Sequence, residues 1–377
     1  MISGKCLDLD ELNKSLEQPL CVFVLPISGG GFVTQLAILQ HLCESKYLPN
    51  LILSASGGNV AAYVGAAADW KWAGIERISR ELSQNLFVSS WSRVATLSKI
   101  FGYFKGNFYN RGSGVYDFLN NYFNSTTIQK YEIWTGTYNS TRSKARLFCN
   151  RSAQTSILDP NCIDNDLTQS LEPIFNDGNI TNIADAGVAS ASIPSLVPPQ
   201  IILNEEYVDA AIAAASPLTF MKEPILDYLH KHDVPLHLIY INSVDLANPN
   251  IEPINNVLDT IRRATSNLVR SQTVIDRLAG YELLRCHGTI LKEEFVCNYD
   301  TMQAIREMQT YIKYLMIEIY PKTAHDIDLT NFNGEIVVEH MKQAYKDCCC
   351  RLYWVEPKNR DYVNQINYLI NICKGII

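Results

Sequence analysis

A serine surrounded by small residues lies at position 56, within Ser54-Ala55-Ser56-Gly57-Gly58. A nucleophilic serine is exposed best on a tight turn between a buried strand and a helix, where crowding of the backbone requires small neighbours. The N-terminus of the helix that follows directs N–H groups and a positive dipole end towards the serine oxygen. The pattern predicts a nucleophile for acyl transfer, although Ser54 replaces the first glycine of G-x-S-x-G. A turn without catalytic function is the alternative.

Three consecutive glycines, Gly29, Gly30 and Gly31, form a second candidate element. Consecutive glycines allow backbone N–H groups to converge on one point, which could hold the oxyanion of a tetrahedral intermediate. Loss of one such donor typically costs about 3–4 kcal/mol. A nucleotide phosphate loop is disfavoured because neither G-x-G-x-x-G nor G-x-x-x-x-G-K-S/T is present. A tight turn without a function remains the other alternative.

An aspartate, Asp209, follows the apolar residues Tyr207 and Val208 and precedes two alanines. At the end of a strand, an aspartate alone more often caps a turn or helix than performs catalysis. A buried carboxylate, however, can have its pKa raised until it accepts a proton near neutral pH. Asp209 is therefore a third candidate residue, beside Ser56 and the glycine triplet.

Histidines offer an alternative, because His230, His232, His237 and His287 follow Asp209 and could complete a Ser-His-Asp triad. None of them stands in a recognisable catalytic turn, so this alternative is less favoured. The sequence has no H-E-x-x-H motif, no CxxC pair and no EF-hand loop. We expect no metal site and no cofactor, and we expect the cysteines to be reduced thiols.

The elements that must position these residues are alternating strands and helices. The apolar run Leu20–Leu25 predicts a buried strand before the glycines, and a helix is expected over 32–46. A second strand over 51–53 and an alanine-rich helix over 59–70 flank Ser56. Further on, the pattern predicts a strand pair (133–138 and 145–150), a small-residue helix (185–199) and a strand (235–242). This order predicts a three-layer α/β/α fold with a mostly parallel central sheet.

The last third of the chain has helical periodicity, for example over 257–284 and 301–319. A weak break at residues 247–250 suggests two parts, namely a catalytic domain over 18–250 and a helical C-terminal extension over 251–377. Whether that extension is integral to the catalytic domain stays open, and we assign no function to it.

In their order and spacing, the glycine triplet, the strand–serine–helix turn and the late aspartate resemble the patatin-like phospholipase family. The segments Gly114–Asp117, Ala189–Pro194 and Val197–Pro199 share this resemblance, which covers roughly residues 18–245. It implies a lipid acyl hydrolase of phospholipase A or lysophospholipase type. In that family the serine attacks the acyl carbonyl and one aspartate is its base, without a histidine. Carried over, Ser56 is the nucleophile, Asp209 the base, and Gly29, Gly30 and Gly31 the oxyanion hole.

The sequence departs from the family motifs at several positions. Where the family has D-G-G-G-x-R/K-G, this chain has residues Ser28 to Thr34, and Val33 replaces the basic residue. Where the family has D-G-G or D-G-A, this chain has Ala210 in place of the middle glycine. These changes favour an alternative function, a catalytically inactive patatin-like protein that binds lipid or acts as an interaction module. A third interpretation is an esterase or transacylase for small soluble esters.

Composition limits the partners. With a net charge of −7 the chain has no basic footprint for nucleic acid. The polar, acidic N-terminal segment is unlike a secretory signal, so an intracellular, cytoplasmic location is expected. Residues 86–116 combine aromatic and basic side chains without an acidic one, which suits peripheral contact with an anionic membrane; a lid or core segment is the alternative. The sequence gives no oligomeric state.

Overall fold

The structure is a computed structural model that describes residues 18–82, 117, 120–122, 130–158, 171–176, 179–194, 198–245, 257–327 and 332–376. For residues 171, 172, 180 and 257–269 it describes the backbone alone. The stretch 86–116, which we predicted to contact membranes, lies outside these residues. No helix in the described ranges is long and apolar enough to cross a bilayer.

One mixed sheet forms the centre of the molecule, in the order β5-β4-β3-β2-β1-β8-β10-β11-β9, with β7 paired to β3 and β6 to β7. Its five central strands, from β3 to β10, run parallel, and the pairs at either side are mostly antiparallel. The strands are β1 (Leu20–Leu25), β2 (Leu51–Ala55), β3 (Glu132–Asn139), β4 (Lys144–Cys149), β5 (Leu171–Phe175), β6 (Gln200–Ile202), β7 (Glu205–Asp209), β8 (Leu236–Ile241), β9 (Ile290–Val296), β10 (Tyr314–Pro321) and β11 (Cys348–Val355).

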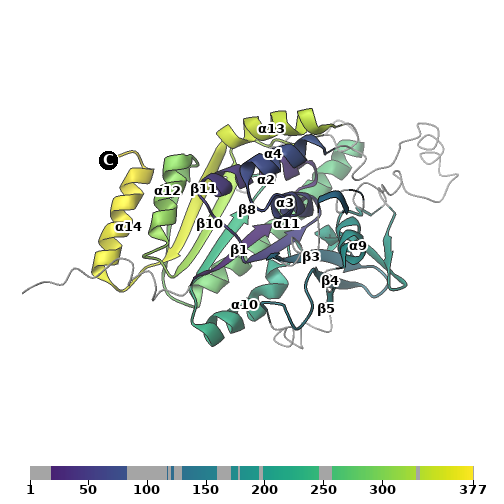
Figure 1. Ribbon diagram of the computed structural model, residues 1–377, viewed down its shortest axis with the longest axis horizontal. Coiled ribbons are helices and arrows are strands. Elements are labelled where there is room, and N and C mark those ends of the chain that lie inside the picture. Colours follow the sequence, from purple (N-terminus) through teal and green to yellow (C-terminus); the bar gives the residue numbers. More distant parts are fainter. Residues whose placement is uncertain are drawn as a thin grey trace, which may run out of the picture.

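Helices cover both faces of the sheet, which confirms the predicted three-layer fold (Figure 1). One face carries α2 (Phe32–Glu44), α3 (Gly57–Ala67), α4 (Trp72–Arg80), α9 (Ile180–Ser190), α12 (Tyr299–Met308), α13 (Gly334–Lys346) and α14 (Arg360–Cys373). The other carries α10 (Leu218–His232) and α11 (Val257–Arg285). Because both faces are covered, β1, β2 and β8 are buried along their whole length.

The register of the parallel strands decides where the candidate residues meet. Leu25 of β1 lies opposite Ser54 of β2, and Val24 lies opposite Tyr240 of β8. The glycine triplet, Ser56 and the segment after β8 therefore leave the sheet at the same edge. Carboxyl ends of parallel strands are the usual place for ligands in such sheets.

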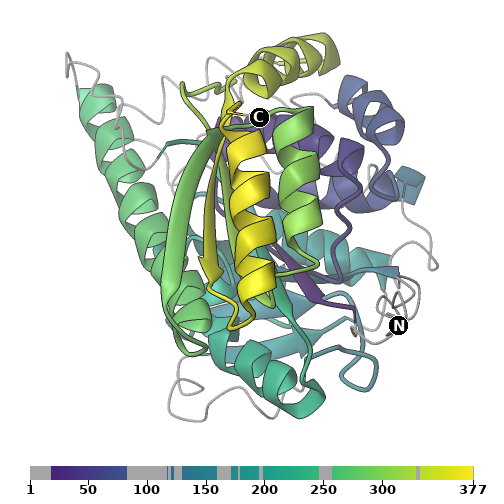
Figure 2. The same ribbon diagram turned by 90° about the vertical axis from the view of Figure 1, so that its left-hand side faces the viewer.

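The last third of the chain differs from the expected helical pattern. We predicted a helix over 301–319, but α12 ends at Met308 and β10 begins at Tyr314. Residues 290–355 also supply β9, β10 and β11 to the central sheet, on which α12 and α14 lie side by side (Figure 2). A purely helical extension over 251–377 is thus wrong. The small-residue helix also ends early, at Ser190.

Candidate active site

Ser56 occupies a strained turn between β2 and α3. Its backbone has φ 51° and ψ −127°, a combination that side-chain-bearing residues rarely adopt and that clusters at functional sites. The Ser56 N–H donates to Ser190 Oγ at 2.9 Å, and that hydroxyl in turn donates to the Gly136 carbonyl at 2.5 Å. Ser190 thus links α9 and β3 to the serine turn and holds its conformation. Sequence analysis gave Ser190 no such role.

The two glycines after Ser56 allow α3 to approach the end of β1. A Cβ on Gly57 would lie 2.5 Å from the Gly29 carbonyl oxygen, and one on Gly58 would lie 2.2 Å from the Leu25 carbonyl oxygen. Real Cβ atoms do not tolerate such contacts, so both positions require glycine. The serine turn and the glycine triplet are consequently in direct backbone contact.

Asp209 lies beside Ser56, for which the patatin-like resemblance implies that it is the base. It ends β7, which pairs with β3 so that Asp209 is opposite Thr137, while Gly136 of β3 is opposite Ala55 of β2. This pairing brings the aspartate next to the serine turn. Ser56 Oγ donates to Asp209 Oδ2 at 2.6 Å, and the Ala211 N–H donates to Oδ1 at 2.8 Å.

The environment of the Asp209 carboxylate suits a base that works near neutral pH. The side chain is 1% exposed, and this burial raises its pKa from the ordinary 3.8 to about 6. The hydrogen bonds from Ser56 and Ala211 act in the opposite direction but do not cancel the effect of burial. In the described part of the chain, no histidine contacts either residue of the pair.

The histidine alternative gains nothing from the structure. His237 lies within β8 and is 2% exposed, and its Nε2 contacts the Ile312 carbonyl oxygen at 3.2 Å. Burial lowers the pKa of His237 to about 4. It is a core histidine far along the strand from the edge where Ser56 lies.

The glycine triplet forms a short 3-10 turn, η1 (Gly29–Gly31), before α2. Within that turn the Gly31 N–H donates to the Ser28 carbonyl at 2.8 Å, and the Phe32 N–H donates to the Gly29 carbonyl. Gly29 has φ 52° and faces open space, with no heavy atom within 4 Å of an added Cβ. The N–H of Gly31 is therefore already engaged within the turn, so that of the three predicted oxyanion donors Gly31 has its N–H bonded to the protein itself.

A family model described as patatin-like phospholipase matches residues 25–221, which span the triplet, the serine turn and Asp209. The chain belongs to the patatin-like phospholipase family. No curated protein matches the sequence. Among solved structures, VipD from Legionella pneumophila is similar with a TM-score of 0.34 and 10% identity, over 95% of this chain and 67% of that one. A likeness at this level says nothing about the site.

The departures from the patatin-like motifs each have a structural place. Ser54 is buried, and its hydroxyl donates to Asn59 Oδ1 at 2.5 Å, which ties β2 to the first turn of α3. Ala210 begins the short turn η4 (Ala210–Ile212). Its backbone φ is not positive, so no glycine is required at this position. Both residues are therefore compatible with the geometry of the dyad.

The glycine triplet is also fixed from the other side, by a segment that follows β10. A Cβ on Gly30 would lie 2.2 Å from the Ile327 carbonyl oxygen, and the Ile327 N–H donates to the Gly30 carbonyl at 3.3 Å. Thr34, at the closing-glycine position of the patatin-like motif, donates its hydroxyl to the His325 carbonyl at 3.2 Å. Residues 325–327 hence belong to the site, and nothing in the sequence indicated them.

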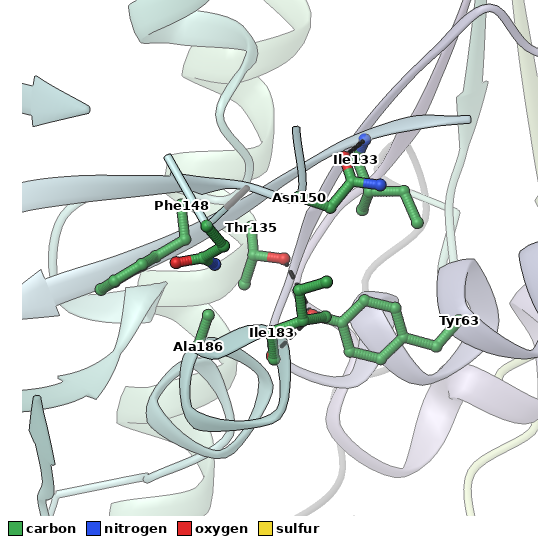
Figure 3. Close-up of a pocket in the computed structure, with 8 residues that line it drawn as sticks. Tyr63, Ile133, Thr135, Phe148, Asn150, Ile183 and Ala186 are labelled. Atoms are coloured by element: carbon green, nitrogen blue, oxygen red, sulfur yellow. Dashed lines mark hydrogen bonds between the residues drawn. The ribbon is translucent and has the colours of Figure 1, made fainter. Parts of the chain in front are cut away.

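The structure also contains a small cavity, which is not lined by Ser56 or Asp209. It is enclosed by β3, β4, α3 and α9, where the Tyr63 and Thr135 hydroxyls are 3.1 Å apart (Figure 3). The side chains of Ile133, Phe148 and Ala186 point into the same space. Because Ser56 and Asp209 are not among its lining residues, we do not assign it to the substrate.

Proposed function

We propose that the protein is a lipid acyl hydrolase of phospholipase A or lysophospholipase type that works through a Ser56–Asp209 dyad. Family membership supports lipid acyl hydrolysis in general. The observation that carries the finer proposal is the 2.6 Å hydrogen bond from Ser56 Oγ to a buried carboxylate, on a backbone turn with positive φ. Turns of this kind present the serine of many hydrolases.

In the acylation step, Ser56 Oγ attacks the ester carbonyl carbon while Asp209 takes the hydroxyl proton. The carbonyl oxygen becomes an oxyanion, which the N–H groups of Gly29 and Gly30 stabilise. When the tetrahedral intermediate collapses, the C–O bond to the alcohol breaks and the proton on Asp209 passes to the departing alkoxide. The product is an acyl ester of Ser56 and a free alcohol.

Deacylation repeats these steps with water. Asp209 takes a proton from the water molecule as its oxygen attacks the acyl carbonyl, and the second tetrahedral intermediate releases the fatty acid. The proton returns to Ser56 Oγ. Because Asp209 must be ionised at the start of each half-reaction, activity should be lost as the pH falls through about 6.

The test is labelling with a fluorophosphonate probe, which phosphonylates activated serines. Wild type is compared with Ser56→Ala and with Asp209→Asn, which keeps the shape of the carboxylate but removes the base. We expect labelling of wild type alone, with a rate that is half-maximal near pH 6. If folded wild type does not label in the presence of vesicles, the inactive lipid-binding alternative replaces this proposal. Labelling that persists in Ser56→Ala would show that the nucleophile lies elsewhere.

We also propose that residues 86–116 bring the enzyme to an anionic membrane surface. The support is the composition of this stretch, since its basic and aromatic side chains suit the headgroup region. Replacement of Trp91, Phe101 and Phe104 by Ser should reduce co-sedimentation with anionic liposomes. Unchanged co-sedimentation would contradict this proposal and favour the alternative of a lid or core segment.

A further inference from the structure

The segment after β10 places a carboxylate beside the glycine triplet. Asp326 Oδ1 would lie 2.7 Å from a Cβ on Gly31, as would the Cβ of Ser243, the second residue after β8. At most about 7 Å of backbone separates Gly31 from Gly29, the glycine that faces open space. Asp326 therefore lies next to the region where a substrate ester must sit to reach Ser56.

Nearby positive charge balances the Asp326 carboxylate only in part. Within the described ranges it forms no hydrogen bond and no ion pair within 4 Å. The charges that lower its pKa are those of His325, which is paired with Asp347 at 3.2 Å, and of His340 in α13. Although the residue as a whole is exposed, its carboxylate lies against the loop, and the resulting desolvation raises the pKa of Asp326. A cation brought to this carboxylate would be stabilised there.

The sign of the charge at the loop is opposite to that of the family motif. The motif has Arg or Lys where this chain has Val33, and Val33 is completely buried. A carboxylate beside an oxyanion hole opposes the negative charge that develops on the substrate. An ammonium group on the substrate would remove that opposition, whereas a net-anionic headgroup would add to it.

We propose that Asp326 is a specificity-determining residue that selects ester lipids with an ammonium headgroup over lipids with a net-anionic headgroup. This inference rests on the proposed function, because it places a lipid ester over Gly29. It concerns binding selectivity, however, and can be measured without turnover. A unit charge acting across about 5–10 Å of partly aqueous space should change a ratio of affinities about 3- to 20-fold.

The experiment uses the full chain with Ser56→Ala, so that the lipid is not consumed. Dissociation constants are measured by calorimetry for monomeric dihexanoylphosphatidylcholine and dihexanoylphosphatidylglycerol. We expect tighter binding of the choline lipid, and a loss of this preference by about 3- to 20-fold after Asp326→Asn. Asp326→Glu, which retains the charge, should preserve most of the preference. Asp361→Asn, at an exposed aspartate in the first turn of α14, the helix labelled at the left of Figure 1, is the matched charge control.

A preference that changes less than twofold in Asp326→Asn would overturn the inference. So would an equal change in Asp361→Asn, tighter binding of the glycerol lipid before substitution, or binding of neither lipid. Failure of the hydrolase proposal has a different signature. In that case wild type does not react with the fluorophosphonate, whereas the lipid preference and its dependence on Asp326 persist.

Discussion

Replacement of Asp209 by Asn should make the protein more stable at alkaline pH while it abolishes labelling of Ser56. Burial holds the pKa of this carboxylate at about 6 in the folded protein, against an ordinary value of 3.8. Folding therefore favours the protonated form. The stability that comes from this preference is complete below pH 3.8, and it is lost as the pH rises through about 6 and Asp209 ionises. Asparagine has a similar shape and never carries the charge.

The size of the gain follows from these two values. Each pKa unit corresponds to about 1.4 kcal/mol, so ionised Asp209 destabilises the fold by about 3 kcal/mol at pH 8. Near pH 4 the same relation gives only about 0.5 kcal/mol. Burial also raises the pKa of Asp276 to about 6, but this residue is present in both proteins, so its effect cancels in the comparison.

Urea unfolding of wild type and Asp209→Asn at pH 4 and pH 8 measures both numbers. We expect the difference in the free energy of unfolding to grow between the two pH values by about 2–3 kcal/mol in favour of the variant. Asp361→Asn, at an exposed position in the first turn of α14, should change this free energy by less than about 1 kcal/mol, and in the direction of lower stability. The claim is that burial makes the ionised form of Asp209 unfavourable in the folded protein. It would be refuted by a variant less stable than wild type at pH 8, or by a gain in stability that does not depend on pH.

Three further substitutions test how the site is held. Gly30→Ala places a methyl group 2.2 Å from the Ile327 carbonyl oxygen. We expect it to destabilise the fold by about 1–3 kcal/mol and to displace the glycine loop, with loss of fluorophosphonate labelling. Labelling at the wild-type rate would contradict the observed contact. Ser190→Ala leaves the buried Ser56 N–H without its acceptor and should slow labelling about tenfold or more, measured at pH 8 where Asp209 is ionised. Asp276→Ala removes the acceptor of hydrogen bonds from Ser216, Tyr240 and Thr219 and should lower the free energy of unfolding by about 3 kcal/mol or more, whereas Asp276→Asn should cost less.

The first half of the fold could be predicted because its signals are local. The run Leu20–Leu25 became β1 with the same bounds, and the small residues around Ser56 predicted the turn that the structure contains. The partnership of Ser56 with Asp209 came from the order of family motifs, since 153 positions separate the two residues and no spacing rule connects them.

The second half could not be predicted as well, for two physical reasons. The run Tyr314–Pro321 is apolar and short, and such a run is compatible with a buried helix as well as with a buried strand. The contacts of Ile327 with Gly30 are backbone contacts across almost 300 positions, and backbone contacts leave no pattern of side-chain types. The role of Ser190 could not be predicted, because a serine whose hydroxyl accepts from a backbone N–H cannot be distinguished in the sequence from any other serine in a small-residue helix.

The contacts of residues 325–327 with the glycine triplet have a consequence for the order in which the site can form during protein synthesis. Residues 325–327 leave the ribosome long after Ser56, Asp209 and the glycine triplet have emerged. Until then the glycine triplet packs against the serine turn but lacks its contact with Ile327, and β8 lacks its neighbour β10. We therefore expect a chain that ends before residue 325 to contain Ser56 and Asp209 and yet to lack the ordered glycine triplet, so that it does not react with a fluorophosphonate.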